Sequence, residues 1–258
     1  MQSILFEIKN NIAFITLNRP EKFNSFNREM ALSLQELLKE AGTNKEVRCV
    51  YLTGSGKAFC AGQDLAEVVD PKGPGMENIL LDHFNPIVNI IRKLQKPVVA
   101  AVNGVAAGAG ANIALCCDVV IASASASFIQ AFSKIGLIPD SSGTFFLPRL
   151  IGFQKASAFM MLGDKVSAAE AEKIGMIYKS FSDEIYQEEA AKIASTLASM
   201  PTRGLWYTKQ ALNYSLMNNL DEQLHIELVL QQKAAATSDF KEGVSAFLEK
   251  RNPLFKGE

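Results

Sequence analysis

The sequence predicts an α/β protein with a helical C-terminal region. In the first half of the chain, short apolar runs typical of strands alternate with segments whose apolar residues repeat at helical spacing. After Pro139, amphipathic helical segments dominate. The chain has 258 residues, 48% of them hydrophobic, which is enough for one sizeable core. We therefore expect an α/β core over residues 1–200 and a helical region over residues 201–258.

The first elements are expected to be a β-hairpin, a helix and a buried strand. Ile4–Lys9 and Asn11–Leu17 are rich in β-branched and aromatic residues, and the asparagines between them favour a tight turn. Asn27–Ala41 carries apolar residues at helical spacing. Val47–Thr53 is a mainly apolar run, which suits a strand covered on both faces.

The alternation of strands and helices is expected to continue to about residue 122. The predicted elements are a short strand ending near Phe59, a helix over roughly 76–94, a strand Val98–Val102, a helix over about 108–117, and a strand Val119–Ala122. The apolar stretch 97–129 is rich in alanine and broken by glycine and asparagine, so it is too weak for a membrane span.

The second half is expected to consist of helices with short connections. Ser167 and Glu170 form an S-x-x-E capping box that opens a short helix, which Gly175 ends. Three longer amphipathic helices are predicted at Glu184–Met200, Leu220–Ala236 and Phe240–Lys250. Their apolar stripes exceed what the α/β half can cover, which favours packing against neighbouring subunits.

The charge balance and the cysteines limit the expected partners. There are 26 lysines and arginines against 27 aspartates and glutamates, a formal net charge of -1. Such a balance provides no long-range attraction to nucleic acid or anionic membranes, so neither is an expected partner. The four cysteines show no C-x-x-C spacing, so no disulfide framework and no thiolate metal site is expected. The N-terminus does not resemble a signal peptide, and we expect a cytoplasmic protein.

Two glycine-rich turns, at residues 55–64 and 103–112, are candidates for ligand binding. Neither matches a P-loop or a dinucleotide-binding fingerprint. A helix that begins near Gly108 would point its free N–H groups and positive dipole toward a ligand. Two such turns facing each other would form an oxyanion hole for a thioester enolate. The alternative is that these glycines only allow tight turns and close helix packing.

Four ordered motifs resemble the crotonase superfamily, the enoyl-CoA hydratase/isomerase group. They are NRPEKFNSFN (18–27), GSGKAFCAGQDL (54–65), KPVVAAVNGVAAGAGANIALCCDVVIAS (96–123) and FSKIGLIPDSSGTFFLPRLIG (132–152). The resemblance covers essentially the whole chain and implies a crotonase-like ββα spiral core with a helical C-terminal trimerisation region. It also implies an acyl-CoA thioester substrate, no separate cofactor, and a homotrimer or a dimer of trimers.

The resemblance assigns roles to residues within these motifs. The amides of Gln63 and Ala109 would form the oxyanion hole. Further contacts would come from Ala61, Asp64, Leu65, Asn112 and Phe132 to the acyl substrate, and from Lys22, Phe23 and Ala58 to coenzyme A. For Asp64, capping of the following helix is the alternative, and for Lys22 and Arg28 it is a solvated surface position.

The catalytic group implied by the resemblance is a single carboxylate, Asp140. Hydratases of the group resemble one another in two glutamates, and this chain has Asn112 and Phe132 at those places. Without paired carboxylates, efficient hydration is not expected. Asp140 resembles the isomerase branch, which includes ring-epoxide isomerases, and one carboxylate suffices to remove a proton at one carbon and return it at another. Turn formation or helix capping is its alternative role.

The sequence therefore favours an acyl-CoA isomerase that uses an oxyanion hole and Asp140. The alternatives are a specialised enoyl-CoA hydratase and a non-catalytic CoA-binding scaffold subunit. His83 and His225 are expected to be structural, and Cys60 has no neighbouring base in the sequence that would mark it as a nucleophile.

Overall fold

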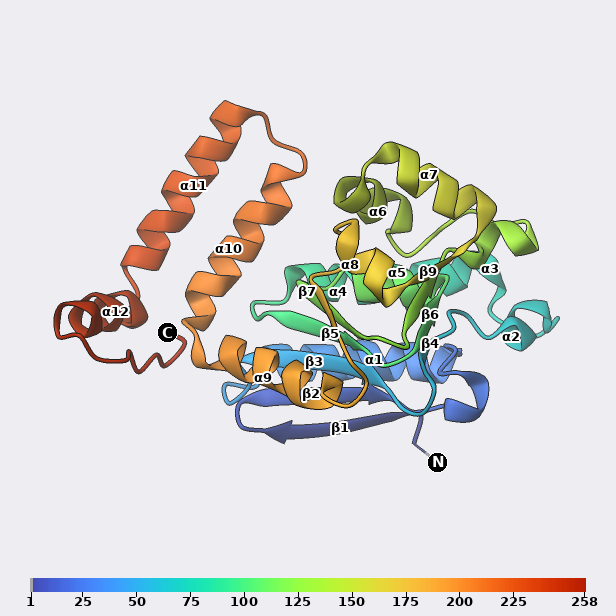
Figure 1. Cartoon of the computed structure of the whole chain (residues 1–258), viewed down its shortest axis with the longest axis horizontal. Helices are drawn as coiled ribbons and strands as arrows, with labels where there is room; N and C mark the ends of the chain where they lie inside the picture. The colour runs from blue at the N-terminus through green and yellow to red at the C-terminus, as the bar shows by residue number, and fades with distance from the viewer. Residues whose placement is uncertain (1) are drawn as a thin grey trace.

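The computed structural model describes residues 2–258 and contains two β-sheets (Figure 1). The first sheet has the strand order β1-β2-β3-β5-β7-β10, and the second has the order β4-β6-β8-β9. The strands are β1 (Ile4–Lys9), β2 (Ile12–Leu17), β3 (Cys49–Gly54), β4 (Ala58–Cys60), β5 (Val98–Val102), β6 (Val105–Ala107), β7 (Val119–Ser123), β8 (Ser127–Ile129), β9 (Lys165–Ser167) and β10 (Lys179–Phe181).

Successive strand pairs contribute one strand to each sheet, which produces a spiral. β3, β5 and β7 lie parallel in the first sheet, while β4, β6 and β8, each a few residues further along the chain, lie parallel in the second. The expected ββα spiral core is thereby confirmed. β1 and β2 form the expected hairpin, and Asn10 and Asn11 supply its turn with φ values of 51° and 62°.

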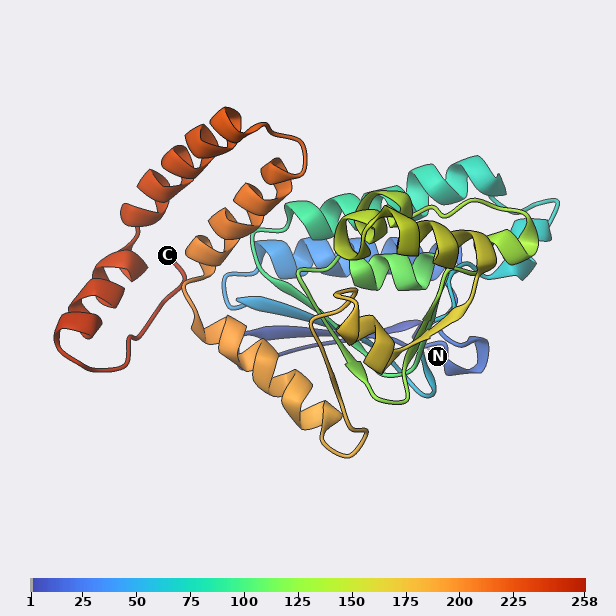
Figure 2. The same cartoon turned by 45° about the horizontal axis from the view of Figure 1, so that its top comes forward.

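Helices cover both faces of the first sheet (Figure 2). The core half contains α1 (Arg28–Thr43), α2 (Leu65–Val69), α3 (Gly75–Asn78), α4 (Asn85–Lys93), α5 (Ala109–Leu115), α6 (Gly143–Ile151), α7 (Phe153–Leu162), α8 (Ala168–Lys173) and α9 (Tyr186–Ser199). Along β5, Val98 and Ala100 belong to the large core with α1 and α4, whereas Val99 and Ala101 belong to a smaller core with α9. This double burial explains why the strand sequence is continuously apolar.

The C-terminal region is helical, as expected, and projects from one end of the spiral core (Figures 1 and 2). It contains α10 (Thr202–Ser215), α11 (Leu220–Ala235) and α12 (Ser238–Leu248). The buried ammonium of Lys209 on α10 donates to the carboxylate of Asp118 at 2.7 Å and to the carbonyl of Ile91 at 2.6 Å. These bonds attach α10 to the core.

Three local expectations were wrong in detail. The helix expected over 76–94 is divided into α3, a π-helical segment at Ile79–Phe84, and α4. The capping box of α8 forms only in part, because the Ser167 hydroxyl accepts from the Glu170 amide while the Glu170 carboxylate pairs with Lys155 at 3.9 Å. Strands β6, β8, β9 and β10, each of three residues, were not predicted.

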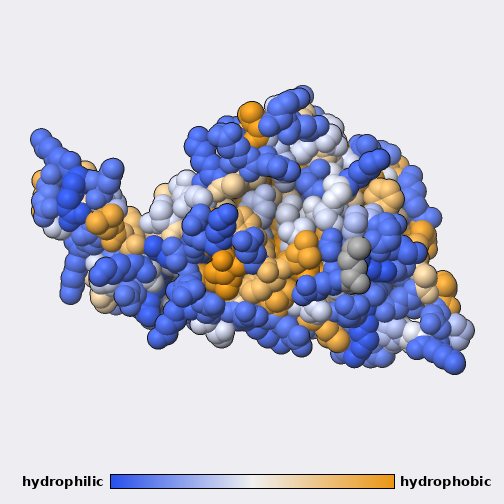
Figure 3. Space-filling view, turned by 90° about the horizontal axis from the view of Figure 1, so that it is seen from below, coloured by the Kyte–Doolittle hydropathy of each residue, from blue (hydrophilic) through white to orange (hydrophobic). Residues whose placement is uncertain are grey.

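The surface retains apolar side chains that a single chain does not cover. Seen from below, the molecule is mainly hydrophilic, with a band of apolar side chains across its middle (Figure 3). In the C-terminal region, Leu212, Leu224, Leu228 and Phe247 are exposed. No helix among residues 2–258 is both long enough and apolar enough to cross a membrane.

Candidate active site

The predicted site residues gather around one cavity of about 360 Å³, at the ends of β4 and β6. Two short 3₁₀ segments, Pro20–Lys22 and Ala131–Ile135, each contribute residues to its wall. The predicted residues that line the cavity are Lys22, Phe23, Ala61, Gln63, Asp64, Leu65, Ala109, Phe132 and Asp140. Ala58 and Asn112 do not line it: Ala58 is buried in β4, and Asn112 is buried on α5.

Two backbone amides facing this cavity lack acceptors. Phe26 donates its N–H to the Gly62 carbonyl at 2.7 Å, and its carbonyl accepts from the Asp64 N–H at 2.8 Å, which leaves the Gln63 amide between them unpaired. Ala109 is the first residue of α5, where N–H groups have no partner within the helix. Neither the Gln63 nor the Ala109 amide donates to an acceptor in residues 2–258.

The turns that carry these amides are in contact, and glycine makes the contact possible. Gly62 has a φ of +93° and Gly108 a φ of +53°, both in the region that disfavours other residues. A Cβ atom at Gly62 would lie 3.0 Å from the Ala107 carbonyl oxygen and 3.4 Å from the Ala109 nitrogen. This arrangement places two free donors and the positive end of α5 beside one cavity, which suits a developing oxyanion.

Asp140 contributes a partly buried carboxyl group to the same cavity. The Ser141 hydroxyl donates to its Oδ1 at 2.7 Å. Burial raises the pKa of Asp140 above its ordinary value, and the hydrogen bond from Ser141 opposes that rise. The carbonyl of Asp140 accepts the Gly143 amide in a turn, while Ser142 is the residue that precedes α6. The carboxylate is therefore free of a helix-capping role.

The remaining predicted residues form the walls of the cavity. Asp64 caps α2 by accepting the Ala66 amide at 3.2 Å, and it also pairs with Arg19 at 3.0 Å. The Phe132 ring approaches the backbone at Gly108, where an added Cβ would lie 3.7 Å from it. An apolar ring thus stands beside the amide pair, and Asp140 is the carboxyl that remains free of an ion pair.

Several lining residues were not found from the sequence. Met76, Ile79 and Phe84 reach the cavity from α3 and the π-helical segment, and Lys134 and Leu137 reach it from the chain before Asp140. Apolar periodicity indicates that a residue is buried, but it does not distinguish a core position from a position that lines a cavity.

Other groups considered from the sequence lie outside the cavity. His83 is buried, with Nε2 3.3 Å from an Arg28 nitrogen, and His225 is on α11. Burial raises the pKa of Cys60 to about 12, which keeps it a thiol. Among residues 2–258, no group of three or more His, Cys, Asp or Glu side chains is arranged to hold a metal ion.

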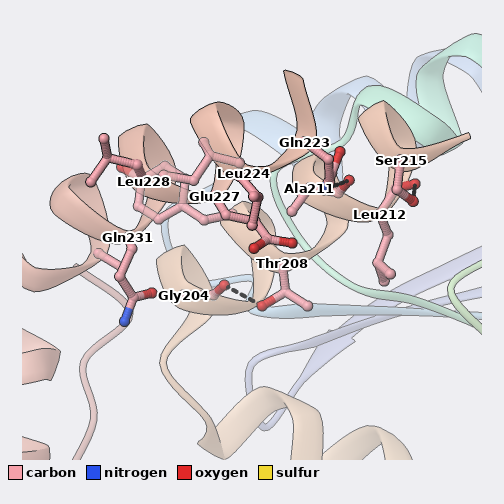
Figure 4. A pocket seen from close by; sticks show the side chains of 13 residues that line it. Gly204, Thr208, Ala211, Leu212, Ser215, Gln223, Leu224, Glu227, Leu228 and Gln231 are labelled. Atoms are coloured by element: carbon pink, nitrogen blue, oxygen red, sulfur yellow. Dashed lines mark hydrogen bonds between the residues drawn. The ribbon is translucent and has the colours of Figure 1, made fainter. Parts of the chain in front are cut away.

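A second, larger hollow of about 720 Å³ lies between α10 and α11 (Figure 4). Leu212, Leu224 and Leu228 contribute its apolar surface, and Glu227 is the carboxylate among the residues that line it. Because Glu227 is exposed, whereas the carboxyl of the first cavity is partly buried beside two unpaired amides, this hollow has no comparable arrangement for acyl chemistry.

The fold and this cavity define the class of protein: the chain belongs to the enoyl-CoA hydratase/isomerase family, whose model matches residues 7–258. The 1,2-epoxyphenylacetyl-CoA isomerase of Escherichia coli K12 is 48% identical over the full length of both chains. The 2,3-dehydroadipyl-CoA hydratase of the same organism is 34% identical, again over both full lengths. The crystal structure of enoyl-CoA hydratase from Bacillus anthracis superposes with a TM-score of 0.92 at 33% identity, covering both chains completely.

Proposed function

We propose that this protein is an acyl-CoA isomerase that shifts a proton and a double bond through a thioester enolate. The observation that carries the proposal is one partly buried carboxyl, Asp140, in the same cavity as the unpaired amides of Gln63 and Ala109. The amides would bind the thioester oxygen and stabilise the negative charge that develops when a neighbouring carbon loses a proton.

The proton balance requires only Asp140. Its carboxylate accepts a proton from the α-carbon of a 3-enoyl thioester, and the electron pair passes to the thioester oxygen. When the carbonyl reforms, the double bond moves to the 2-position and Asp140 returns the proton to the γ-carbon. A carboxyl whose pKa is raised by burial is a better proton acceptor than an ordinary aspartate, so the partly buried position suits this cycle.

We infer that an aromatic ring epoxide is a candidate acyl group. The support is the 48% identity to 1,2-epoxyphenylacetyl-CoA isomerase and the apolar walls supplied by Val68, Ile79, Phe84 and Phe132. Expansion of such an epoxide to a seven-membered oxepin breaks the bond between the two epoxide carbons and neither gains nor loses atoms. The oxyanion amides would hold the thioester during this rearrangement.

Replacement of Asp140 tests the proposal. Asp140→Asn keeps the shape of the side chain and loses the proton acceptor, so double-bond migration should fall by about 10²- to 10⁴-fold while acyl-CoA binding persists. Product double bonds would be located by NMR after incubation with straight-chain and aromatic enoyl-CoA panels in deuterated buffer. Asp164→Asn, a change at an exposed aspartate outside the cavity, is the matched control and should leave the rate unchanged.

The same assay separates the alternatives. A specialised hydratase is favoured by the 34% identity to 2,3-dehydroadipyl-CoA hydratase, and it would yield hydroxyacyl-CoA as the main product. A non-catalytic CoA-binding scaffold would exchange no substrate proton for deuterium. Near-normal migration by Asp140→Asn, or crotonyl-CoA hydration as the best wild-type reaction, would contradict the isomerase assignment.

A further inference from the structure

The segment that carries Asp140 has an unfavourable backbone conformation. The two residues after Asp140, Ser141 and Ser142, have φ values of 49° and 67°, in the left-handed region. Residues with a side chain adopt this region at a cost in free energy, and two in succession are uncommon. Such a conformation persists only where the surrounding structure holds it in place.

A buried amide on α5 supplies that support. Asn112 is 1% exposed, and its Nδ2 donates to the backbone carbonyl oxygen of Asp140 at 2.8 Å. Its amide group also packs against the start of α6, where a Cβ at Gly143 would lie 2.3 Å from Nδ2. Asn112 lies three residues after Ala109 on the same helix, so α5 bears both an oxyanion amide and the bond that holds the Asp140 segment.

Gln130 in turn fixes the orientation of the Asn112 amide. Gln130 Nε2 donates to Asn112 Oδ1 at 2.8 Å, which requires the nitrogen of Asn112 to face Asp140. Gln130 is 4% exposed, and its Oε1 has no hydrogen-bond partner among residues 2–258. A buried amide oxygen without a partner is costly. The bond to Asn112 is therefore the polar contact that accounts for a glutamine at this position.

We infer that Asn112 and Gln130 are positioning residues that hold the Asp140 carboxylate at a fixed place relative to the oxyanion amides. The inference rests on the proposed role of Asp140. Neither side chain lines the cavity, so both act through the Asp140 segment and not on the substrate. Loss of either bond allows the strained segment to relax away from its active position, while the amides of Gln63 and Ala109 stay in place.

A double-mutant cycle with Asp140→Asn tests whether Asn112 and Gln130 act through Asp140. Asn112→Ala and Gln130→Met should each lower kcat for double-bond migration by about 10- to 10²-fold, the effect of a misplacement near 1 Å, with KM changed less than about threefold. In the Asp140→Asn background the same changes should have no further effect on the residual rate. An equal loss in that background, or a higher KM at unchanged kcat, would overturn the inference.

Two further measurements keep the test informative if Asn112→Ala folds poorly. Ser142→Gly removes the strain at one left-handed residue, so it should restore part of the kcat lost in Gln130→Met. The acid limb of the pH–kcat/KM profile should also move to lower pH in Gln130→Met, because a relaxed Asp140 is less buried. No rescue together with an unmoved pH profile would overturn the inference. Near-normal activity of Asp140→Asn alone would instead refute the proposed function.

Discussion

Gly110→Ala is the sharpest test of how α5 positions the Ala109 amide, which we propose as one donor of an oxyanion hole. Gly110 is the second residue of α5 and follows Ala109 directly. An added Cβ would lie 2.4 Å from the backbone oxygen of Cys60 and 2.7 Å from its Cβ and Sγ atoms. No side-chain rotation removes a clash with a backbone atom. The helix α5 and the strand β4 would therefore have to separate.

The distances set the expected size of the effect. A return to an ordinary contact of 3.4 Å requires a separation of about 1 Å between α5 and the end of β4. Overpacking of this kind costs about 1–3 kcal/mol in the free energy of unfolding. A displacement of 1 Å at a catalytic donor lowers the rate by about 10²-fold, comparable to the loss of one oxyanion-hole donor. We expect Gly110→Ala to remain folded and to lose about 10²-fold in kcat.

The assay pairs isomerase kinetics with urea unfolding. Gly204→Ala in α10 is the matched control, because the same methyl group would there meet Pro201, the residue before the helix, at an ordinary 3.6 Å. The control should keep full activity and gain up to about 1 kcal/mol from helix propensity. If Gly110→Ala retained wild-type kcat, the contact of α5 with β4 would not set the position of the Ala109 amide, and the reasoning would fail.

Three other outcomes are expected. Lys209→Met should lower the free energy of unfolding in urea by about 3 kcal/mol, because the buried polar groups that bond to Lys209 lose their partner. Lys192→Met, which breaks an exposed ion pair, should change the free energy of unfolding by less than about 1 kcal/mol. Burial lowers the pKa of Lys96 to about 8, so the unfolded state binds more protons between about pH 8 and 10. Wild-type stability should therefore rise with pH in this window relative to Lys96→Met, and a constant difference would contradict the assignment. Light scattering at micromolar concentration should give a trimer or hexamer, since the leucines on α10 and α11 are exposed in one chain, and a monomeric mass would refute this.

Much of the fold was predictable because its determinants are local. Asn10 and Asn11 favour the left-handed conformations of a tight hairpin turn, and the structure has them. The long runs at β3 and β5 are apolar because both faces are covered. The second sheet could not be predicted in the same way. Its strands have three residues each, and their pairing depends on segments that are distant in sequence.

Part of the residues that line the cavity could be predicted from the sequence, whereas their geometry could not. Motif positions identified Gln63, Ala109 and Asp140, which the structure gathers around one cavity. The left-handed backbone at Ser142 has no local sequence signal, because serine rarely adopts it. The bond from Asn112 to the Asp140 carbonyl spans 28 positions, so no local pattern indicates it. Asn112 was expected to contact the substrate, whereas in the structure it lies outside the cavity and binds the backbone of Asp140.

The parallel pairing of β4 with β6 brings together the two turns that carry the Gln63 and Ala109 amides. Neighbouring parallel strands end at the same edge, so the turns after β4 and β6 meet whatever the chain does between them. That intervening chain, residues 65–97, contains α2, α3, the π-helical segment and α4, and it supplies Val68, Met76 and Phe84 to the cavity wall. Under the proposed function, the side chains of this segment would therefore help to set the acyl preference, while the turns after β4 and β6 supply the two amides.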